Sequence, residues 1–258
     1  MSFVERFFAL TGRNTVVIGG SGVLGSAMSE GLARAGANVA ILGRSLTKAQ
    51  RQAERLKAHG VSSLAIQADV TSKQALQAAC NEIISDWKRV DILVNAPGVN
   101  SATPFFDVTE EEWEQIIAIN LKGIFLACQV FGQQMLVQQS GNIINISSMS
   151  SGPPLSKVFT YSVSKAGINN LTQNLAREWA GDGIRVNAIL PGFFPAEQNK
   201  KILTPERKAA IFRHTPMGRF GEPGELIGTL LWLAADKASS YVTGALIRVD
   251  GGFSAMSI

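Results

Sequence analysis

The 258-residue chain carries 24 lysines and arginines against 20 aspartates and glutamates, a formal net charge of +4, and 46% of its residues are hydrophobic. An apolar fraction of this size can bury a large core, which excludes a disordered or fibrous protein. The basic residues are scattered along the chain, and this argues against a nucleic-acid-binding surface.

The cysteines and the N-terminus indicate a cytoplasmic protein. Cys80 and Cys128 lie in apolar segments without metal-like spacing, so we expect buried free thiols and no disulfide. Glu5 and Arg6 interrupt the apolar start of the chain, which is not typical of an export signal. No apolar run approaches the ~20 residues that span a bilayer, so we expect no membrane segment.

Short apolar runs alternate with amphipathic stretches from one end of the chain to the other. The candidate strands are residues 16–18, 39–42, 64–66, 92–94, 143–146, 186–189 and 245–247. Such runs are typical of parallel strands covered on both faces, and helical patterns such as 24–35 and 113–138 lie between them. The alternation predicts an α/β fold: a single doubly wound, Rossmann-type domain over residues 1–258, with a parallel sheet of about seven strands flanked by helices on both faces.

A glycine-rich turn follows the first of these strands and opens the first long helix. Residues 19–25 read GGSGVLG, in which Gly20, Gly22 and Gly25 satisfy the G-x-G-x-x-G spacing. Glycines there allow a tight turn, bring bare backbone close to a pyrophosphate and let the helix N-terminus bind the anion. The context predicts a dinucleotide site, with an ordinary turn between strand and helix as the alternative.

The end of the second strand indicates which dinucleotide binds. NAD sites place a carboxylate about 20 residues beyond the glycines, where it binds the ribose 2′-hydroxyl and repels a 2′-phosphate. Here the strand ends instead in Arg44 and Ser45. Arg44 can pair with a 2′-phosphate and Ser45 adds a hydroxyl, so we expect NADP(H) to be favoured over NAD(H). If Arg44 is only a solvated loop residue, either cofactor can bind.

Tyr161 and Lys165 lie four residues apart in a helical pattern, which places both side chains on one helix face. A phenol is a poor acid or base at neutral pH, because its reference pKa is about 10. An adjacent ammonium favours the phenolate, so we expect Lys165 to lower the pKa of Tyr161 toward the working range. The pair predicts a proton-transfer site.

Ser147 and Ser148 close the candidate strand 143–146, at the carboxyl edge of the sheet where open α/β folds bind ligands. A serine hydroxyl beside the phenol of Tyr161 can hold a carbonyl or alcohol oxygen while a hydride moves to or from a nicotinamide. Local capping of the backbone is the alternative for a serine at a strand end.

Eight different short motifs follow one another along the chain. They are Gly19 to Gly25, Ala68-Asp69-Val70, Asp91-Ile-Leu-Val-Asn95-Ala-Pro-Gly98, Asn120, Ile146-Ser-Ser148, Tyr161-x-x-x-Lys165, Pro191-Gly192 and Val249-Asp-Gly-Gly252. In this order and spacing the chain resembles a short-chain dehydrogenase/reductase of the short type, from the glycine loop to the C-terminus.

The resemblance implies reversible carbonyl reduction with four catalytic residues. By it, Tyr161 is the general acid/base, Lys165 tunes it and binds the nicotinamide ribose, and Ser148 orients the reacting oxygen. Asn120 is implied to hold a water through which Lys165 exchanges protons. Together with Arg44 and Ser45, the expected cofactor-binding residues are Gly19, Ser21, Gly22, Val23, Leu24, Gly25, Asp69, Val70, Asn95, Ala96, Gly98, Tyr161, Lys165, Pro191, Gly192 and Phe194.

The chain departs from the family's pattern at three places. Ile18 stands where the family usually has a threonine, and the middle glycine is displaced by one place to Gly22. Pro97 fixes φ and removes an N–H in the stretch that is usually N-N-A-G. The common threonine after Pro191-Gly192 has no counterpart. The four catalytic residues are intact, while the phosphate and carboxamide contacts are expected to differ in detail.

Residues 193–218 break the alternation of strands and helices and mix aromatic with basic residues, as a substrate lid does. Their charged residues are Lys200, Lys201, Arg207, Lys208 and Arg213 against Glu197 and Glu206. These cations can attract a carboxylated or phosphorylated substrate, and a solvated helix face is the alternative.

The stretch 192–199 and the glycine loop are similar to the sugar-acid and polyol branch of the family, such as gluconate 5-dehydrogenase and mannonate oxidoreductase. A sugar acid or polyol is therefore the expected substrate, with reduction of a 3-oxoacyl thioester on acyl carrier protein as the enzymatic alternative. A non-catalytic NADP-binding sensor is a further alternative, against which the intact catalytic residues argue. Ser162 and Lys165 fit the S-x-x-K of serine acylases, whose other motifs the chain lacks.

No metal, nucleic acid or membrane partner is expected. His59 and His214 have no second ligand at metal spacing. Residues 241–250 resemble the family's edge strand, which commonly pairs subunits, and helices 120–137 and 166–180 are a second expected contact surface. By this analogy we expect a homotetramer.

Overall fold

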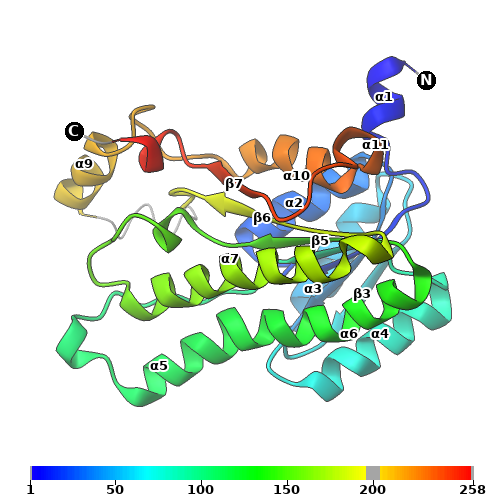
Figure 1. Ribbon diagram of the computed structural model, residues 1–258, viewed down its shortest axis with the longest axis horizontal. Coiled ribbons are helices and arrows are strands. Elements are labelled where there is room, and N and C mark those ends of the chain that lie inside the picture. Colours follow the sequence, from blue (N-terminus) through cyan, green and yellow to red (C-terminus); the bar gives the residue numbers. More distant parts are fainter. Residues whose placement is uncertain (1, 196–203, 257–258) are drawn as a thin grey trace.

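Seven parallel strands form one sheet in the computed structural model, which describes residues 2–195 and 204–256 (Figure 1). The strands are β1 (Asn14–Ile18), β2 (Asn38–Gly43), β3 (Ser63–Gln67), β4 (Ile92–Asn95), β5 (Gly141–Ile146), β6 (Ile184–Pro191) and β7 (Leu246–Val249). Their spatial order is β3-β2-β1-β4-β5-β6-β7, and every neighbouring pair is parallel. Each candidate strand of the sequence overlaps one of these strands, which confirms the predicted fold class.

Helices cover both faces of the sheet. They are α1 (Phe3–Phe8), α2 (Val23–Arg34), α3 (Leu46–Lys57), α4 (Lys73–Trp87), α5 (Glu110–Ile117), α6 (Gly123–Gln138), α7 (Phe159–Trp179), α9 (Pro205–Arg213), α10 (Ile227–Ala234) and α11 (Asp236–Ser239). Helices α2, α3 and α10 supply buried side chains to one face, and α4, α6 and α7 supply them to the other.

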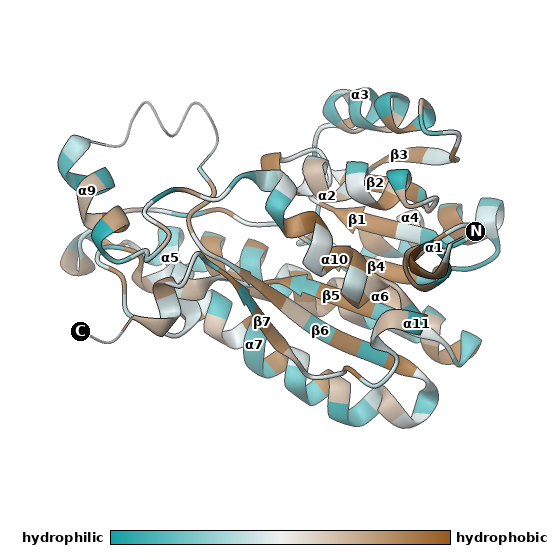
Figure 2. Cartoon of the chain, turned by 90° about the horizontal axis from the view of Figure 1, so that it is seen from above, coloured by the Kyte–Doolittle hydropathy of each residue, from teal (hydrophilic) through white to brown (hydrophobic). Residues whose placement is uncertain are grey.

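The central strand β1 shows why the strands are apolar along their whole length. Val16 and Ile18 belong to the core cluster on one face, and Val17 belongs to the cluster on the other. Side chains alternate between the faces of a strand, so a sheet covered on both sides needs apolar residues at every position. Figure 2 shows this as hydrophobic colour along the strands of the interior.

The strand order reverses between β1 and β4. β1 pairs with β2 on one side and with β4 on the other. The chain segments that leave the carboxyl ends of β1 and β4 therefore run to opposite faces, and such a switch point leaves a crevice between them. The ends of β5 and β6 lie along the same edge, so the crevice is where the predicted site residues converge.

The predicted helix 113–138 is interrupted in its first half. Between α5 and α6 lies a π-helical turn, Ala118–Lys122, which contains the fully buried Asn120. One extra residue per turn does not alter the hydrophobic pattern visibly, so the sequence alone does not locate such a turn. π-helical turns inside α-helices often occur at functional sites.

The helical stretch 110–138 is also apolar and long enough to pass for a membrane span. Its most apolar window of 18 residues has a mean hydropathy of 1.5, and a buried core helix can reach such a value as well as a membrane span can. In the fold, 56% of its most apolar window is buried against the rest of the protein. Packing of a core helix therefore accounts for its composition.

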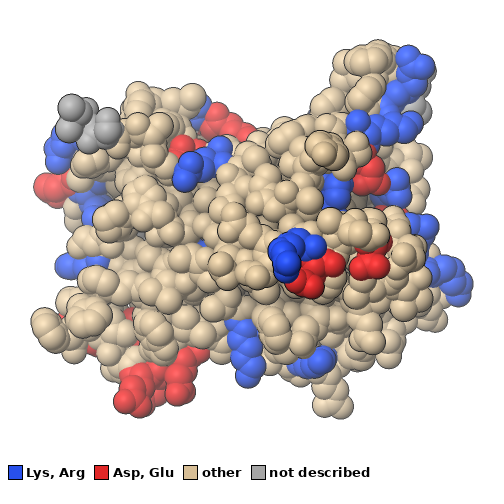
Figure 3. All heavy atoms as spheres, viewed as in Figure 1, with Lys and Arg blue, Asp and Glu red and all other residues tan. Residues whose placement is uncertain are grey.

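Cys80 and Cys128 are buried free thiols, as predicted, and burial raises their pKa values to about 11 and about 12. On the face drawn in Figure 3 the basic side chains are scattered and not gathered into a patch. Both observations agree with the composition.

Candidate active site

The glycine turn after β1 is packed so tightly that it excludes side chains. Gly19 has a φ of +76°, and a Cβ there would lie 2.7 Å from the carbonyl oxygen of Ala96. A Cβ on Gly25 would lie 2.1 Å from the carbonyl oxygen of Gly19. Gly22 is the N-cap of α2 and offers no side chain to its first N–H groups. Uncapped amides of a 12-residue helix over bare backbone fit an anionic pyrophosphate.

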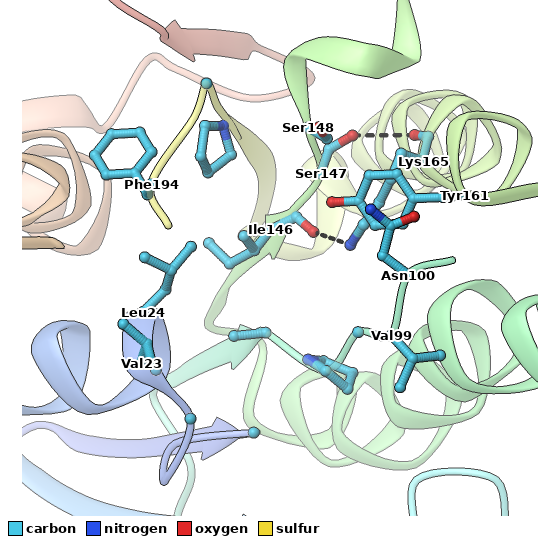
Figure 4. Close-up of a pocket in the computed structure, with 18 residues that line it drawn as sticks. Val23, Leu24, Val99, Asn100, Ile146, Ser147, Ser148, Tyr161, Lys165 and Phe194 are labelled. Carbon is cyan, nitrogen blue, oxygen red and sulfur yellow. Dashed lines mark hydrogen bonds between the residues drawn. The ribbon is translucent and has the colours of Figure 1, made fainter. Parts of the chain in front are cut away.

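A cavity of about 420 Å³, which we call the cofactor cavity, lies over this turn at the carboxyl edge of the sheet (Figure 4). It is lined by Gly19, Gly22, Val23, Leu24, Gly25, Ala96, Pro97, Gly98, Val99, Asn100, Ile146, Ser147, Ser148, Tyr161, Lys165, Pro191, Gly192 and Phe194. The structure thus brings the glycine loop, three of the four predicted catalytic residues and the segment after β6 to one cavity.

Arg44 and Ser45 follow the neighbouring strand β2, outside that lining. Arg44 is exposed, and within the described residues its guanidinium makes no ion pair. Ser45 is the N-cap of α3, and its hydroxyl accepts from the N–H of Lys48 at 3.4 Å, so its own proton stays available. Ser21 lies close by, because its Oγ is 3.6 Å from where a Cβ on Gly43 would stand.

Asp69 lies on the adjacent strand end, after β3. The N–H and hydroxyl of Thr71 both donate to its Oδ1, at 2.9 and 2.8 Å, and lower the pKa of the carboxyl, with a smaller contribution from the charge of Arg44. The hydrogen bonds fix the carboxylate while leaving its Oδ2 open. Ser21, Arg44, Ser45 and Asp69 therefore form a polar cluster along the edge of the sheet next to the cofactor cavity.

Two predicted cofactor residues point their side chains into the core instead. Asn95 is fully buried, and its Nδ2 donates to Oδ1 of Asn145 at 2.9 Å, between β4 and β5. The side chain of Val70 packs against Gly123, where a Cβ would lie 2.8 Å away. The side chains of Asn95 and Val70 are thus engaged within the core, and the predicted cofactor contacts of these two residues stay predictions.

Ser148 both caps the backbone and reaches the phenol. Its Oγ accepts from the N–H of Ser150 at 3.2 Å and lies 3.1 Å from the Ser150 hydroxyl. Its side chain is also close enough to Tyr161 to act against the rise in the pKa of that phenol. The capping and the functional interpretations of this serine are therefore compatible, and together they hold the hydroxyl in one orientation.

The expected lowering of the Tyr161 pKa is not found. Burial raises the pKa of Tyr161, and the hydrogen bond to Ser148 opposes this only in part. Lys165 is also buried, which lowers its pKa to about 8. Its Nζ donates to the carbonyl oxygen of Ile146 at 2.8 Å and lies 5.6 Å from the Tyr161 ring centroid. The prediction counted the attraction between the charges and omitted the cost of removing both from water.

Asn120 is bound on every side by protein atoms. Its Oδ1 accepts from the N–H of Val99 at 2.9 Å, and its Nδ2 donates to the Val99 carbonyl at 2.9 Å and to Oγ of Ser164 at 3.1 Å. Both its Oδ1 and Nζ of Lys165 lie within 4 Å of where a Cβ on Gly98 would stand. Asn120 thus joins the loop after β4 to α7, and its role in holding a water stays a prediction.

A second cavity of about 450 Å³, which we call the substrate cavity, opens on the other side of the same hydroxyls. It shares Asn100, Ser148, Tyr161, Gly192 and Phe194 with the cofactor cavity. The rest of its lining is Ala102, Met149, Ser150, Leu155, Val158, Phe193, Pro195, Arg207 and Ile211. Ser148 and Tyr161 therefore stand where a substrate and a second reactant can meet.

The predicted lid is described only in part. Glu197, Lys200 and Lys201 lie outside the described residues. Helix α9 follows, and Arg207 and Ile211, one turn apart on it, both line the substrate cavity. Sequence reasoning named Arg207 only as one charge among several, because the helix face that meets the cavity depends on where α9 packs.

Asn100, which lines both cavities, was missed by the sequence analysis, since nothing in its immediate sequence marks it. Of the two histidines, His59 pairs with Glu30, and His214 is the C-cap of α9. Across residues 2–195 and 204–256, no group of three or more His, Cys, Asp or Glu side chains is placed to hold a metal ion.

Comparison with known proteins places the chain among oxidoreductases. A family model described as enoyl-(acyl carrier protein) reductase matches residues 20–254. An uncharacterized oxidoreductase of Bacillus subtilis (strain 168), UxuB, is 42% identical over 269 residues, which cover 96% of this chain and 97% of that protein. The 5-keto-D-gluconate 5-reductase of Escherichia coli (strain K12) is 35% identical over 250 residues, with 96% and 98% covered. The 3-oxoacyl-[acyl-carrier-protein] reductase FabG of Staphylococcus aureus (strain Mu50) is 38% identical over 241 residues, with 93% and 97% covered.

Solved structures match the fold closely. A gluconate 5-dehydrogenase from Burkholderia cenocepacia J2315, in complex with NADP and tartrate, has a TM-score of 0.94 and 30% identity, covering 98% of this chain and 100% of that one. A putative D-mannonate oxidoreductase from Haemophilus influenza with bound NAD has a TM-score of 0.93 and 36% identity, with 98% and 99% covered.

Proposed function

The chain belongs to the short-chain dehydrogenase/reductase family, and on that premise we propose that it interconverts a ketone and a secondary alcohol of a sugar acid, with NADP(H) as its preferred cofactor. The observation that carries the proposal is the position of the Ser148 and Tyr161 hydroxyls on the boundary of two cavities. One cavity has the uncapped helix N-terminus and bare glycine backbone that suit a dinucleotide. The other is a separate space for the carbon that reacts.

When bound, the nicotinamide cofactor supplies a hydride to the carbonyl carbon, or accepts one in the reverse direction. Tyr161 donates its phenolic proton to the carbonyl oxygen as that oxygen becomes a hydroxyl, and takes it back in oxidation. Ser148, held by Ser150, donates a hydrogen bond to the same oxygen, without transferring its proton, and fixes the position of that oxygen. Burial keeps Tyr161 in its phenol form, which is the form that reduction needs.

Lys165 lies beside the Tyr161 ring and stabilises the ionised form of that side chain. Its ammonium lies 5.6 Å from the ring centroid and stabilises the phenolate that remains once the proton has left. The carbonyl of Ile146 holds this ammonium in place, and Ser147 donates to the Lys165 carbonyl oxygen at 3.0 Å. These contacts explain how a buried lysine keeps one orientation beside Tyr161 (Figure 4).

The preference for NADP(H) rests on Arg44. Its exposed guanidinium makes no ion pair within the described residues, and the free hydroxyl proton of Ser45 stands beside it. No carboxylate ends β2 to repel a 2′-phosphate. Of the two relatives described above, the gluconate 5-dehydrogenase was solved with NADP and the putative mannonate oxidoreductase with NAD, so the family likeness alone leaves the preference open.

The sugar-acid assignment rests on Arg207. Among the described residues it is the one charged side chain that lines the substrate cavity, and it has no carboxylate partner there. A guanidinium presented to a cavity without a counter-ion suits a substrate carboxylate. The names of the gluconate reductase and mannonate oxidoreductase relatives agree with this substrate class.

Reduction of a 3-oxoacyl thioester is the second candidate. It is favoured by the apolar part of the substrate cavity, which includes Leu155, Val158 and Ile211, and by the 38% identity to FabG. An apolar acyl chain fits such a wall, whereas it leaves the guanidinium of Arg207 without a partner.

The test is a fluorescence titration with NADPH and NADH, followed by turnover assays on the same preparation. Reduction of keto sugar acids in preference to 3-oxoacyl thioesters supports the proposal. Turnover of thioesters alone assigns the second candidate, and cofactor binding without any turnover points to a non-catalytic sensor.

The assembly is part of the same proposal: a homotetramer. β7 lies at one edge of the sheet with half-buried strand residues. Phe125 on α6 and Val163 on α7 expose 42% and 50% of their surface, and both lie on the helices of the second expected contact surface. Light scattering in solution tests this, and a monodisperse monomer would contradict it.

A further inference from the structure

The loop that follows β4 is held at both ends of its cavity-facing part. At its start, the amide of Asn120 binds the N–H and the carbonyl of Val99, each at 2.9 Å. Further along, the carboxylate of Glu112 accepts from the hydroxyl of Ser101 through Oε1 and from that of Thr103 through Oε2, each at 2.7 Å. Glu112 lies on α5 and Asn120 in the π-helical turn that continues it. One helical stretch therefore holds residues 99–103.

The side chains of this loop alternate in direction. Ser101 and Thr103 turn to Glu112 and are half-buried, whereas Asn100 and Ala102 are exposed and line the substrate cavity. Residues two apart on an extended chain share a face. Binding of the odd-numbered side chains by Glu112 therefore directs the even-numbered ones into the cavity.

Asn100 is the polar member of that pair, and it lines both cavities together with Ser148 and Tyr161. In Figure 4 its amide points into the pocket on the same side as the Tyr161 ring. Within the described residues the amide has no hydrogen-bond partner of its own, although it offers two donors and an acceptor. Ser148 and Tyr161 are the groups that would bind the reacting oxygen of a substrate. Because Asn100 lies beside them, its amide faces the carbon atoms next to the carbon that reacts.

The structure assigns Asn100 as the group that binds a substrate hydroxyl next to the reacting carbon, and Glu112 as the positioning residue that holds it there. The inference rests on the proposed function and deepens it, since it requires a polyhydroxylated substrate. A hydroxyl both donates and accepts, so one amide can satisfy it in two ways. A 3-oxoacyl thioester has only a methylene beside its ketone and gains nothing from Asn100.

The first experiment compares two six-carbon keto acids, 5-keto-D-gluconate and 5-oxohexanoate, with NADPH as the reductant. The second lacks every hydroxyl of the first while keeping the ketone and the carboxylate. Asn100→Ala should lower kcat/KM for 5-keto-D-gluconate roughly tenfold, mainly through KM, and leave that for 5-oxohexanoate unchanged. An equal loss with both acids would overturn the assignment of Asn100.

The second experiment examines Glu112 by the same assays and by hydrogen exchange. Glu112→Ala should speed amide exchange in residues 99–103 and reproduce the selective loss with 5-keto-D-gluconate. Glu112→Gln should restore both, because an amide side chain can still bind two hydroxyls. Glu114→Ala, an exposed glutamate on the same helix, is the matched control and should change neither. Unchanged exchange in Glu112→Ala would overturn the positioning role.

Failure of the proposed function is recognised separately. If the unaltered protein reduces neither keto acid but does reduce 3-oxoacyl thioesters, the proposed function fails, and the hydroxyl-binding role of Asn100 fails with it. If the unaltered protein prefers 5-keto-D-gluconate and the Asn100 variant keeps that preference, only the inference fails. The cofactor dissociation constant of the control variant Glu114→Ala should equal that of the unaltered protein.

Discussion

The two cavities that meet at Ser148 and Tyr161 are built by different means. One wall of the cofactor cavity is bare glycine backbone, at turns where a Cβ on Gly19 or Gly25 would strike carbonyl oxygens at 2.7 and 2.1 Å. The substrate cavity is walled by side chains from the loop after β4, the segment after β5, the segment after β6 and helix α9. Backbone walls impose glycine at particular positions, whereas side-chain walls accept many residue types.

This difference explains which part of the function can be predicted from the sequence. A glycine pattern between a strand and a helix indicates a dinucleotide site from a few neighbouring residues. The residues that surround the substrate are separated by dozens of positions and carry no shared spacing. A change in the first region should therefore affect every substrate alike, and a change in the second should affect some substrates and spare others.

The largest expected effect is at the boundary itself. Tyr161→Phe removes the proton donor while both cavities keep their shape, so turnover of every substrate should fall by ~10²–10⁴-fold. Cofactor affinity, measured by fluorescence titration, should stay unchanged. The chain's other tyrosine, Tyr241, is fully exposed, and Tyr241→Phe is the matched control. Retained turnover in the Tyr161 variant would remove this residue from the chemistry.

The backbone wall is tested by Gly25→Ala. The added methyl lies 2.1 Å from a carbonyl oxygen that cannot move without displacing the turn, so we expect a loss of about 1–3 kcal/mol of unfolding free energy and weaker binding of both cofactors. Gly228 on α10 has no atom within 4 Å of such a methyl. Gly228→Ala should therefore be neutral or stabilising by up to about 1 kcal/mol in urea unfolding. Equal behaviour of the two variants would show that the turn tolerates a side chain.

Arg44→Ala tests the edge of the cofactor region, where side chains replace backbone. Loss of a charge-assisted hydrogen bond should raise the dissociation constant of NADPH roughly 10–100-fold and leave that of NADH nearly unchanged. Arg51→Ala, an exposed arginine on α3, is the control. Equal changes for the two cofactors would separate Arg44 from the 2′-phosphate.

Arg207→Met tests the substrate cavity, where a change should affect some substrates and spare others. It should raise KM for carboxylated substrates about tenfold and spare an uncharged polyol, because only the carboxylate loses its partner. Arg213→Met alters an exposed arginine at the end of the same helix, outside the cavity lining, and should have little effect. The same KM increase for the polyol would mean that Arg207 acts on packing and not on charge.

The pH dependence gives the smallest and most general test. Burial raises the pKa of Tyr161, so the phenol predominates at neutral pH. Reduction needs the phenol and should stay level through the neutral range, falling only as pH approaches the raised pKa, whereas oxidation needs the phenolate and should rise by at most about tenfold per pH unit. Lys165, with a pKa lowered to about 8, loses its charge above that pH and ceases to support the phenolate, which should flatten the rise. Parallel profiles of kcat/KM in the two directions would contradict this assignment.

The sequence predicted more of the fold than of the site. Alternating apolar runs located all the described strands, since a sheet covered on both faces leaves a continuous signal. The same reasoning missed the π-helical turn at Asn120, whose single extra residue leaves the hydrophobic pattern intact. It also misjudged the Tyr161 pKa, because spacing on a helix shows that two side chains are neighbours and says nothing about how much water surrounds them.

By itself, the sequence determined the α/β fold, the glycine-rich turn after β1 and the placement of Tyr161 and Lys165 on one helix face, because each depends on residues close together in the chain. Only the tertiary structure decided that Asn95 faces the core, that Asn100 and Arg207 share a cavity, and that Glu112 holds the loop between them. These relations join segments far apart in the chain, and they depend on how whole elements pack. Motifs made of neighbouring residues can be recognised in the sequence. The shape and charge of the substrate cavity cannot, because they arise only when the folded sheet brings distant loops together.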